Sequence, residues 1–227
     1  MELKDKILDK YRTKIIHGEL KSGTIMPTQR EMAENESISK SVANSIKIAL
    51  EKEGLITTYP RKKTVVADWK NYPTPLTLPA IVKVAERLPN EELIKAFEEF
   101  RIINEGKCAA LAAQRRTDED IKHLRSALKK IISSEKMEDF ADAHLEFHKG
   151  IFIASHNFLY AAIAESFKGV FYCWGRLNYD TDLRKTNELL EKILEYIEKK
   201  DSMMSEASMN IYSYESSLIL NSYPKHI

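Results

Sequence analysis

Glycine is scarce in this sequence, which holds only seven glycines among 227 residues, and the seven are scattered. Loops that cradle a phosphate need several glycines close together, and neither G-x-G-x-x-G nor G-x-x-x-x-G-K-[ST] occurs. The G-x-S-x-G turn that carries the nucleophile of many hydrolases does not occur either. These absences exclude the commonest nucleotide-binding and esterase motifs, and we predict that the protein is not an enzyme.

Cysteine and long apolar runs are also lacking. The two cysteines, Cys108 and Cys173, form neither a C-x-x-C pair nor a disulfide framework. No apolar run approaches the roughly 18 residues of a membrane helix, and the first residues lack the apolar core of a secretion signal. We therefore expect a cytoplasmic protein that makes no membrane contact.

Charge of one sign is not in excess, because 35 basic and 34 acidic residues leave a net charge of +1. Its distribution is uneven. Residues 1–70 hold 14 Lys/Arg and 10 Asp/Glu, whereas residues 71–227 hold 21 and 24. A mildly basic first segment followed by a mildly acidic remainder favours nucleic-acid binding by the first segment alone.

The first segment contains a helical period over residues 3–17, then two helices separated by a short break. Thr28 with Glu31 forms a capping box for the first of these helices, and Ser39 is a cap for a helix to about Glu53. Gly54 ends that helix. The β-prone runs L-I-T-T-Y and T-V-V-A then flank a basic P-R-K-K tip. This order predicts a helix-turn-helix with a β-hairpin wing.

In a helix-turn-helix, the start of the second helix reaches base edges in the major groove. Ser41, Asn44 and Ser45 are short polar side chains suited to base edges, and Asn favours adenine. Other residues in this segment are suited to phosphates because they are basic or start a helix. These are Thr28, Gln29, Arg30, Lys40, Arg61, Lys62 and Lys63. The alternative is a solvated helix face and a charged hairpin tip that bind nothing.

Four of the seven prolines lie between residues 69 and 89, and we place a linker over 69–77. Helical periods then continue without strand-like alternation. The predicted helices are 79–88, 90–115, 117–133, 137–155, 157–179, 182–200 and 202–221. The predicted fold is therefore mostly α: a winged helix-turn-helix domain over 1–68 and an all-α bundle over 78–227.

The first segment resembles the winged-helix signature of GntR-type transcription regulators. The matching stretches are G-T-I-M-P-T-Q-R-E-M-A (23–33), S-K-S (39–41), L-E-K-E-G-L-I (50–56) and T-V-V (64–66). The bundle resembles the FadR branch of that family, through residues 98–113 and 147–157. The resemblance implies a homodimer. It would bind double-stranded operator DNA through the winged helix-turn-helix domain and a small-molecule effector through the bundle.

The sequence departs from the family pattern in the residues that read DNA. The family usually has Arg at the position of Lys40, and often Arg-Glu at Asn44-Ser45. It has glycines where Arg61 and Lys63 stand, and commonly an apolar residue where Lys47 stands. The resemblance therefore implies the scaffold of a DNA reader but not the operator sequence.

Arg101 lies within an apolar helical pattern, at the position where relatives hold a carboxylate effector. A guanidinium offers a bidentate fork for that role. A structural salt bridge to Glu98 or Glu105 is the alternative. The resemblance gives five further candidate effector-binding residues: His144, His148, Asn157, Arg176 and Tyr212.

His144 and His148 share one helix face at i and i+4, a spacing that can hold a metal. Many FadR-branch sensors use an Asp and a His at this spacing, with two further histidines whose positions are occupied here by Leu190 and Tyr212. We predict no resident metal and no other cofactor, and expect the two histidines to line a polar pocket. A divalent metal there stays the alternative.

The sequence thus predicts a ligand-responsive DNA-binding transcription regulator, a repressor, whose bundle binds a small carboxylate-containing metabolite. One alternative is a regulator that responds to fatty acyl-CoA. A DNA-binding module with a purely structural bundle is another, and a metal-dependent hydrolase built on His144 and His148 is the enzymatic one.

Overall fold

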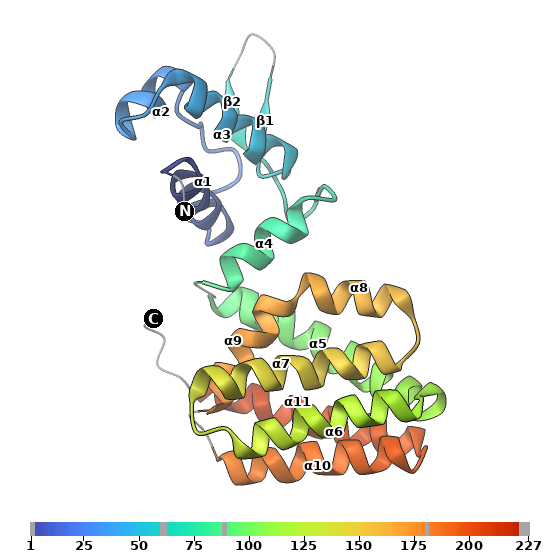
Figure 1. Cartoon of the computed structure of the whole chain (residues 1–227). Helices are drawn as coiled ribbons and strands as arrows, with labels where there is room; N and C mark the ends of the chain where they lie inside the picture. Colours follow the sequence, from blue (N-terminus) through green and yellow to red (C-terminus); the bar gives the residue numbers. More distant parts are fainter. Residues whose placement is uncertain (1–2, 60–62, 88–89, 180–181, 223–227) are drawn as a thin grey trace. The chain divides into compact units, whose positions relative to one another are not determined.

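The computed structural model describes residues 3–59, 63–87, 90–179 and 182–222. The chain divides into two compact units, Met1–Asn90 and Glu91–Ile227, which we call the head and the helical unit (Figure 1). The head contains a small two-stranded sheet, and the rest of both units is predominantly helical. This confirms the predicted fold class of a winged helix-turn-helix followed by an all-helical domain.

The first part of the head holds three helices and a hairpin. They are α1 (Leu3–Ile16), α2 (Gln29–Asn35), α3 (Lys40–Lys52), β1 (Ile56–Thr58) and β2 (Thr64–Val66) (Figure 1). The two strands pair antiparallel with Thr57 opposite Val65. The apolar faces of the helices meet in a core that includes Ile15, Met32, Ile46 and Leu50. Burial of these faces holds α3 against both α1 and α2.

The predicted caps are present. The Thr28 hydroxyl accepts from the Glu31 N–H at 3.2 Å, and the Glu31 carboxylate accepts from the Thr28 N–H at 2.8 Å. This reciprocal capping box starts α2. The Ser39 hydroxyl accepts from the Val42 N–H at 3.2 Å and starts α3. Gly54 follows α3 with a φ of +70°, a left-handed conformation that glycine adopts without strain.

A further helix, α4 (Thr77–Ala85), packs against α1 and belongs to the head. The segment leading into it is tied to the end of α3. The Thr74 hydroxyl donates to the carbonyl of Lys52 at 3.0 Å, and the Thr77 hydroxyl donates to that of Glu53 at 2.6 Å. The last carbonyls of a helix have no partner within it, so these two bonds satisfy groups that α3 leaves open.

The division of the chain after Asn90 therefore differs from the boundary that the sequence suggests, with a linker over 69–77 and the bundle from 78. Prolines and composition mark where regular structure is interrupted, but they do not say which unit a short helix packs against. Side-chain bonds to carbonyls more than twenty residues earlier hold this segment to the head.

The helical unit consists of seven helices in its described residues. They are α5 (Glu91–Arg115), α6 (Asp118–Ser133), α7 (Met137–Ala154), α8 (Phe158–Ser166), α9 (Lys168–Tyr179), α10 (Leu183–Glu198) and α11 (Ser202–Ser222) (Figure 1). α11 packs along α5 and α10, and α7 packs against α5, α6 and α9. α5, α7 and α11 thus enclose the centre of the unit. No helix in the described part of the chain is long and apolar enough to cross a membrane.

The prediction of one helix over 157–179 is wrong. α8 ends at Ser166, and α9 starts at Lys168 after a break at Phe167. The Phe167 ring is buried against two aromatic rings of α5, with centroids 5.3 Å from Phe97 and 5.0 Å from Phe100. No proline lies at this break, where the Phe167 ring packs on α5.

Helices α7 and α9 approach so closely that one glycine is required between them. A Cβ added to Gly175 of α9 would lie 2.9 Å from Cα of Ala141 in α7, closer than real carbon contacts allow. We expect Gly175→Ala to lower the free energy of unfolding by roughly 1–3 kcal/mol, because the two helices would have to separate. Unfolding of both proteins in urea measures the difference.

Gly150→Ala is the matched control. Its new Cβ would lie 2.9 Å from Cδ2 of Leu124, the end of a flexible side chain that can turn away. Both substitutions gain the same helix propensity, so we expect a smaller loss at Gly150. Equal losses at the two positions would contradict the close approach of the α7 and α9 backbones.

Candidate functional site

The candidate DNA-reading surface lies on the head, where α3 and the start of α2 are exposed. Lys40 and Ser41 at the start of α3 are exposed, while Asn44 and Ser45 on its next turn are half-buried. The predicted phosphate-binding residues of the described part are exposed too: Thr28, Gln29, Arg30 and Lys63. Arg61 and Lys62 at the wing tip lie outside the described residues.

Several of these side chains bond to other residues of the same chain. The Gln29 side-chain amide donates to Oδ1 of Asn44, which joins the first residue of α2 to α3. The Ser45 hydroxyl donates to the Ser41 carbonyl at 3.0 Å. Arg30 pairs with Glu34 one turn along α2 at 2.8 Å, and this pair is exposed. The structure thus brings Gln29 and Asn44 together, although their spacing in sequence did not predict it.

Lys47 of α3 stands where the family commonly has an apolar residue, and the structure shows how a lysine fits. Its ammonium group donates to the carbonyl of Pro27 at 3.1 Å, just before α2. Partial burial is the largest effect on its pKa, which lies below the usual value for lysine. The long side chain therefore packs like an apolar residue and ends on a hydrogen bond that ties α3 to α2.

In the helical unit, Arg101 and Glu105 form a buried ion pair on α5. Arg101 Nε donates to one Glu105 oxygen at 3.1 Å and its Nη2 to the other at 3.2 Å. Arg101 is 3% exposed and Glu105 1%. Burial alone would raise the pKa of Glu105, but the charge of Arg101, then that of His148, holds it far below its usual range.

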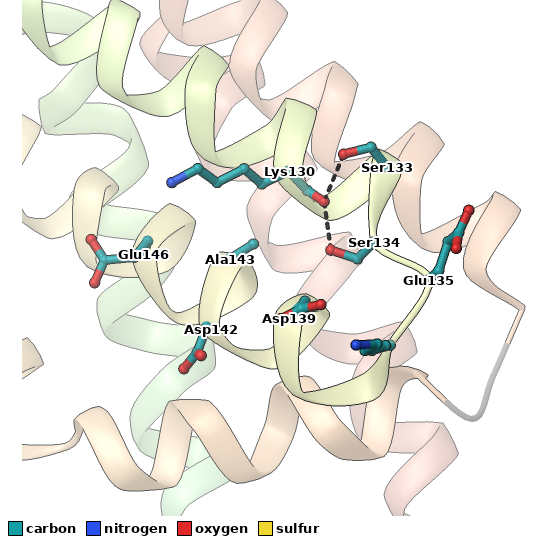
Figure 2. Close-up of a pocket in the computed structure, with 9 residues that line it drawn as sticks. Lys130, Ser133, Ser134, Glu135, Asp139, Asp142, Ala143 and Glu146 are labelled. Carbon is teal, nitrogen blue, oxygen red and sulfur yellow. Dashed lines mark hydrogen bonds between the residues drawn. The ribbon is translucent and has the colours of Figure 1, made fainter.

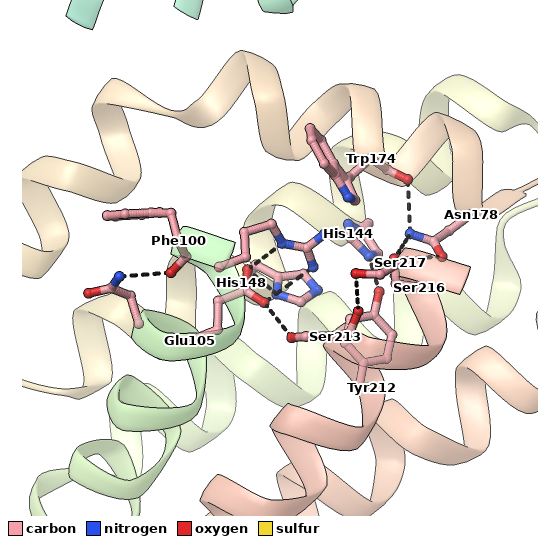
Figure 3. Close-up of polar contacts among 12 residues, drawn as sticks. Phe100, Glu105, His144, His148, Trp174, Asn178, Tyr212, Ser213, Ser216 and Ser217 are labelled. Carbon is pink, nitrogen blue, oxygen red and sulfur yellow. Dashed lines mark hydrogen bonds and ion pairs between the residues drawn. The ribbon is translucent and has the colours of Figure 1, made fainter. Parts of the chain in front are cut away.

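His144 and His148 lie beside this pair, both fully buried on α7. Their ring centroids are 4.4 Å apart. His148 Nδ1 lies 3.3 Å from a Glu105 oxygen, within ionic contact but without hydrogen-bond alignment. The Tyr212 hydroxyl of α11 is hydrogen-bonded to His144 Nε2 (Figure 3). Burial lowers the pKa of His144 well below its usual value and raises that of Tyr212, so both groups are neutral.

Three further residues complete the cluster. The Ser213 hydroxyl donates to Glu105 at 3.1 Å. The rings of Phe171 and Trp174 face the guanidinium of Arg101, with centroids 6.0 Å and 5.4 Å from its Cζ. In this cluster, four buried nitrogens have no hydrogen-bond partner among the described residues: His144 Nδ1, His148 Nδ1 and Nε2, and Trp174 Nε1. Buried polar atoms without partners are rare and mark a place where a polar ligand or water can bind.

The remaining predicted effector residues lie elsewhere. Asn157 caps α8, where its side-chain oxygen accepts from the Leu159 N–H at 3.1 Å. Arg176 is exposed on α9, whereas every member of the cluster is buried. The structure therefore brings together Arg101, His144, His148 and Tyr212, and places these two outside the buried cluster.

The residues at the family's metal positions do not fit a metal ion. Leu190 has no ligating atom and is fully buried in α10. Tyr212 is hydrogen-bonded to His144 Nε2, so that ring nitrogen is already occupied. Within the described ranges, no group of three or more His, Cys, Asp or Glu side chains is placed to hold an ion.

Two cavities lie near the cluster's helices. One of about 200 Å³ lies among α9, α10 and α11, where Tyr212, Asn178 and Ser216 line it. Tyr212 therefore borders this cavity and also reaches His144. An open cleft of about 520 Å³ lies between the end of α6 and the start of α7 (Figure 2). Its lining is mostly charged and exposed, and includes Lys130, Asp139 and Glu146, with none of the predicted effector residues.

Comparison with known proteins gives matches along the whole chain. Residues 97–212 match the model of the FCD domain. The chain is 27% identical over 154 residues to the galactonate operon transcriptional repressor of Escherichia coli, an alignment that covers 67% of each chain. It is 28% identical over 146 residues to the HTH-type transcriptional regulator LutR of Bacillus subtilis, over 63% of this chain and 64% of that one. The structure of Lar, which controls the agr system of Listeria monocytogenes, superposes with a TM-score of 0.60 at 15% identity, and covers 99% of both chains.

The burial of His144 predicts a dependence of stability on pH. Its pKa in the folded chain is far below the 6.5 of the unfolded chain, so below pH 6.5 only the unfolded chain takes up this proton. Stability is therefore lost as the pH falls, by up to about 1.4 kcal/mol per pH unit for one group. We expect His144→Gln, which cannot titrate, to flatten this loss between pH 7 and about 5 in urea unfolding.

The control is His123→Gln, because the His123 ring of α6 is exposed to solvent. We expect this variant to lose stability with falling pH as the wild type does. A wild-type stability that stays level between these pH values would show that the His144 ring is not held neutral.

Proposed function

Since the chain belongs to the FCD-domain family and is a GntR-family transcription regulator, we propose that it represses transcription until a small carboxylate-containing metabolite binds its helical unit. The head binds operator DNA, and the helical unit binds the effector around Arg101. The protein acts in the cytoplasm as a homodimer. The E. coli relative's name supports repression, because that protein is called a repressor.

One observation carries the proposal for the effector. Arg101 is a fully buried cation that already holds a carboxylate, that of Glu105, in a bidentate pair. The same cluster holds four buried nitrogens without hydrogen-bond partners among the described residues. A site with these groups suits an anionic ligand that also carries hydrogen-bonding atoms. An effector carboxylate reaches Arg101 by taking the place of the Glu105 carboxylate.

This exchange supplies a means of switching. An effector can shift the protein between two arrangements only by binding one of them more tightly. Release of Glu105 from Arg101 changes how α5 meets α7 and α11, since His148 and Ser213 also contact Glu105. The change in operator affinity then equals the coupling free energy between the two sites.

The head supplies the DNA-binding half. Base edges are contacted by Ser41 on the exposed start of α3 and by the half-buried Asn44 and Ser45 on its next turn, and Lys40 and Lys63 contact phosphates. Two heads in a homodimer place two such helices about one DNA turn apart. The operator is therefore a pseudo-palindrome.

Among the alternatives, a fatty acyl-CoA effector would also bring negative charge, and the aromatic rings around Arg101 offer apolar surface for an acyl chain. A metal-dependent hydrolase built on His144 and His148 has no specific observation in its favour.

The DNA-binding half is tested by comparing two substitutions on operator fragments selected from random DNA. We expect Asn44→Ala to relax the preference at one base pair in each half-site, because a good base contact is worth about 1–3 kcal/mol of discrimination. Lys63→Ala should weaken all sequences alike and reduce the slope of log affinity against log salt by about 1. Fluorescence anisotropy between about 50 and 200 mM salt measures both.

Lys122→Ala is the control for charge, since Lys122 is an exposed lysine of α6 in the helical unit. We expect no change in affinity or salt slope with it. If wild-type protein selects no sequence at all, the proposed DNA-reading surface is wrong.

The effector half is tested by exchange at Arg101. Carboxylates and acyl-CoA compounds are screened for those that raise the unfolding temperature, since a ligand of the native state stabilises it. We expect Glu105→Gln to bind the active carboxylate about tenfold more tightly or better than wild type, because the competing charge is gone. Calorimetric titration measures the two dissociation constants.

Glu206→Gln is the matched control, because Glu206 of α11 pairs with Lys107 of α5 across the same two helices, but at the surface. We expect unchanged affinity in that variant. The removal of one partner from a buried pair costs about 3–5 kcal/mol, so Glu105→Gln is compared against its own ligand-free unfolding temperature. Weaker carboxylate binding by Glu105→Gln would refute the exchange.

A further inference from the structure

Gln29 and Asn44 join α2 to α3, the two helices of the helix-turn-helix. Their separate positions in the sequence do not predict this contact. Gln29 is the first residue of α2 and is exposed, and Asn44 lies on the second turn of α3 and is half-buried. The Gln29 Nε2–H donates to Asn44 Oδ1. Asn44 therefore faces DNA with one of its hydrogen-bonding sites already occupied.

This bond fixes the direction of the Asn44 amide. A side-chain carbonyl has two lone pairs, so Oδ1 keeps one for another donor, and Nδ2 keeps its N–H groups. A half-turn of the Asn44 amide alone, with Gln29 still donating, would bring its N–H groups against those of Gln29 and lose the bond. One acceptor and one donor are then held in a set order, the pattern that pairs with N6–H and N7 of adenine in the major groove.

Gln29 is itself held in place. The capping box between Thr28 and Glu31 fixes the first turn of α2. The Lys47 ammonium, one turn along α3 from Asn44, donates to the carbonyl of Pro27 at 3.1 Å. The start of α2 is thus tied to α3 at two points, one at the backbone and one through the Gln29 side chain. A partner held this firmly can restrict a side chain on α3.

We propose that Gln29 is a positioning residue for base recognition, which orients the Asn44 amide toward one adenine in each half-site. Gln29 acts through Asn44 rather than as the phosphate contact that the sequence predicts for it. This inference rests on the proposed function of the head as a DNA reader. It assigns base choice at one position to a pair of residues on two helices.

The test uses Gln29→Met, which keeps the length of the side chain and removes its amide. Selection from random DNA followed by affinity measurement at all four base pairs reads the preference at each position. We expect the preference for adenine to fall at the position that Asn44→Ala also relaxes, within the roughly 5- to 150-fold that a bidentate contact supplies. Preferences at the other positions and the salt slope stay unchanged.

The double variant Gln29→Met/Asn44→Ala provides a readout that a structural role would not produce. If Gln29 acts only through Asn44, its substitution has no further effect once Asn44 is gone, so the two effects are not additive. Gln29→Glu adds a second arm. A carboxylate only accepts hydrogen bonds, so the Asn44 amide must turn its N–H toward it, and we expect an altered base preference at that position.

Asn35→Ala, at the exposed far end of α2, is the control and should leave every preference intact. Uniform weakening by Gln29→Met on all sequences, with a salt slope reduced by about 1, would overturn the inference and assign Gln29 to a phosphate. Unchanged preference with Gln29→Met would overturn it too. A wild-type protein without any preference would instead refute the proposed function, and thereby remove its basis.

Discussion

Arg101 and Glu105 lie one helical turn apart on α5 with almost no contact with water, and neither charge could remain there without the other. Residues of three other helices contact this pair. Ser213 of α11 donates to Glu105, His148 of α7 lies against it, and two aromatic rings of α9 face the guanidinium. Four helices thus meet around one ion pair, and the arrangement of the helical unit's centre depends on it.

Much of the fold follows from local signals in the sequence. The caps at Thr28 and Ser39 and the glycine after α3 are chemical features of single turns, and each is found where the pattern predicts it. The break at Phe167 and the attachment of α4 to the head are different. Each arises when a side chain meets a partner far away in the sequence, and no local pattern encodes that meeting.

The candidate site divides in the same way. Arg101 stood out because a guanidinium interrupts an apolar helical pattern. Glu105 lies four residues further along the same helix, so the sequence already offered it as a salt-bridge partner for Arg101. The i, i+4 spacing of His144 and His148 likewise predicted a shared face, which the structure confirms. The bonds from Tyr212 to His144 and from Gln29 to Asn44 join separate helices, and only the folded chain brings those atoms together.

Burial of the cluster also limits how fast a molecule can reach it. Arg101, His148 and Tyr212 are each at most 3% exposed, so a molecule that reaches them must first displace packed side chains. Tyr212 borders the cavity among α9, α10 and α11 and is also hydrogen-bonded to His144. Helix movements of this kind take microseconds to milliseconds. Under the proposed function, the response time of the regulator is set by how often α9, α10 and α11 part, and added ligand shortens it only until that opening rate is reached.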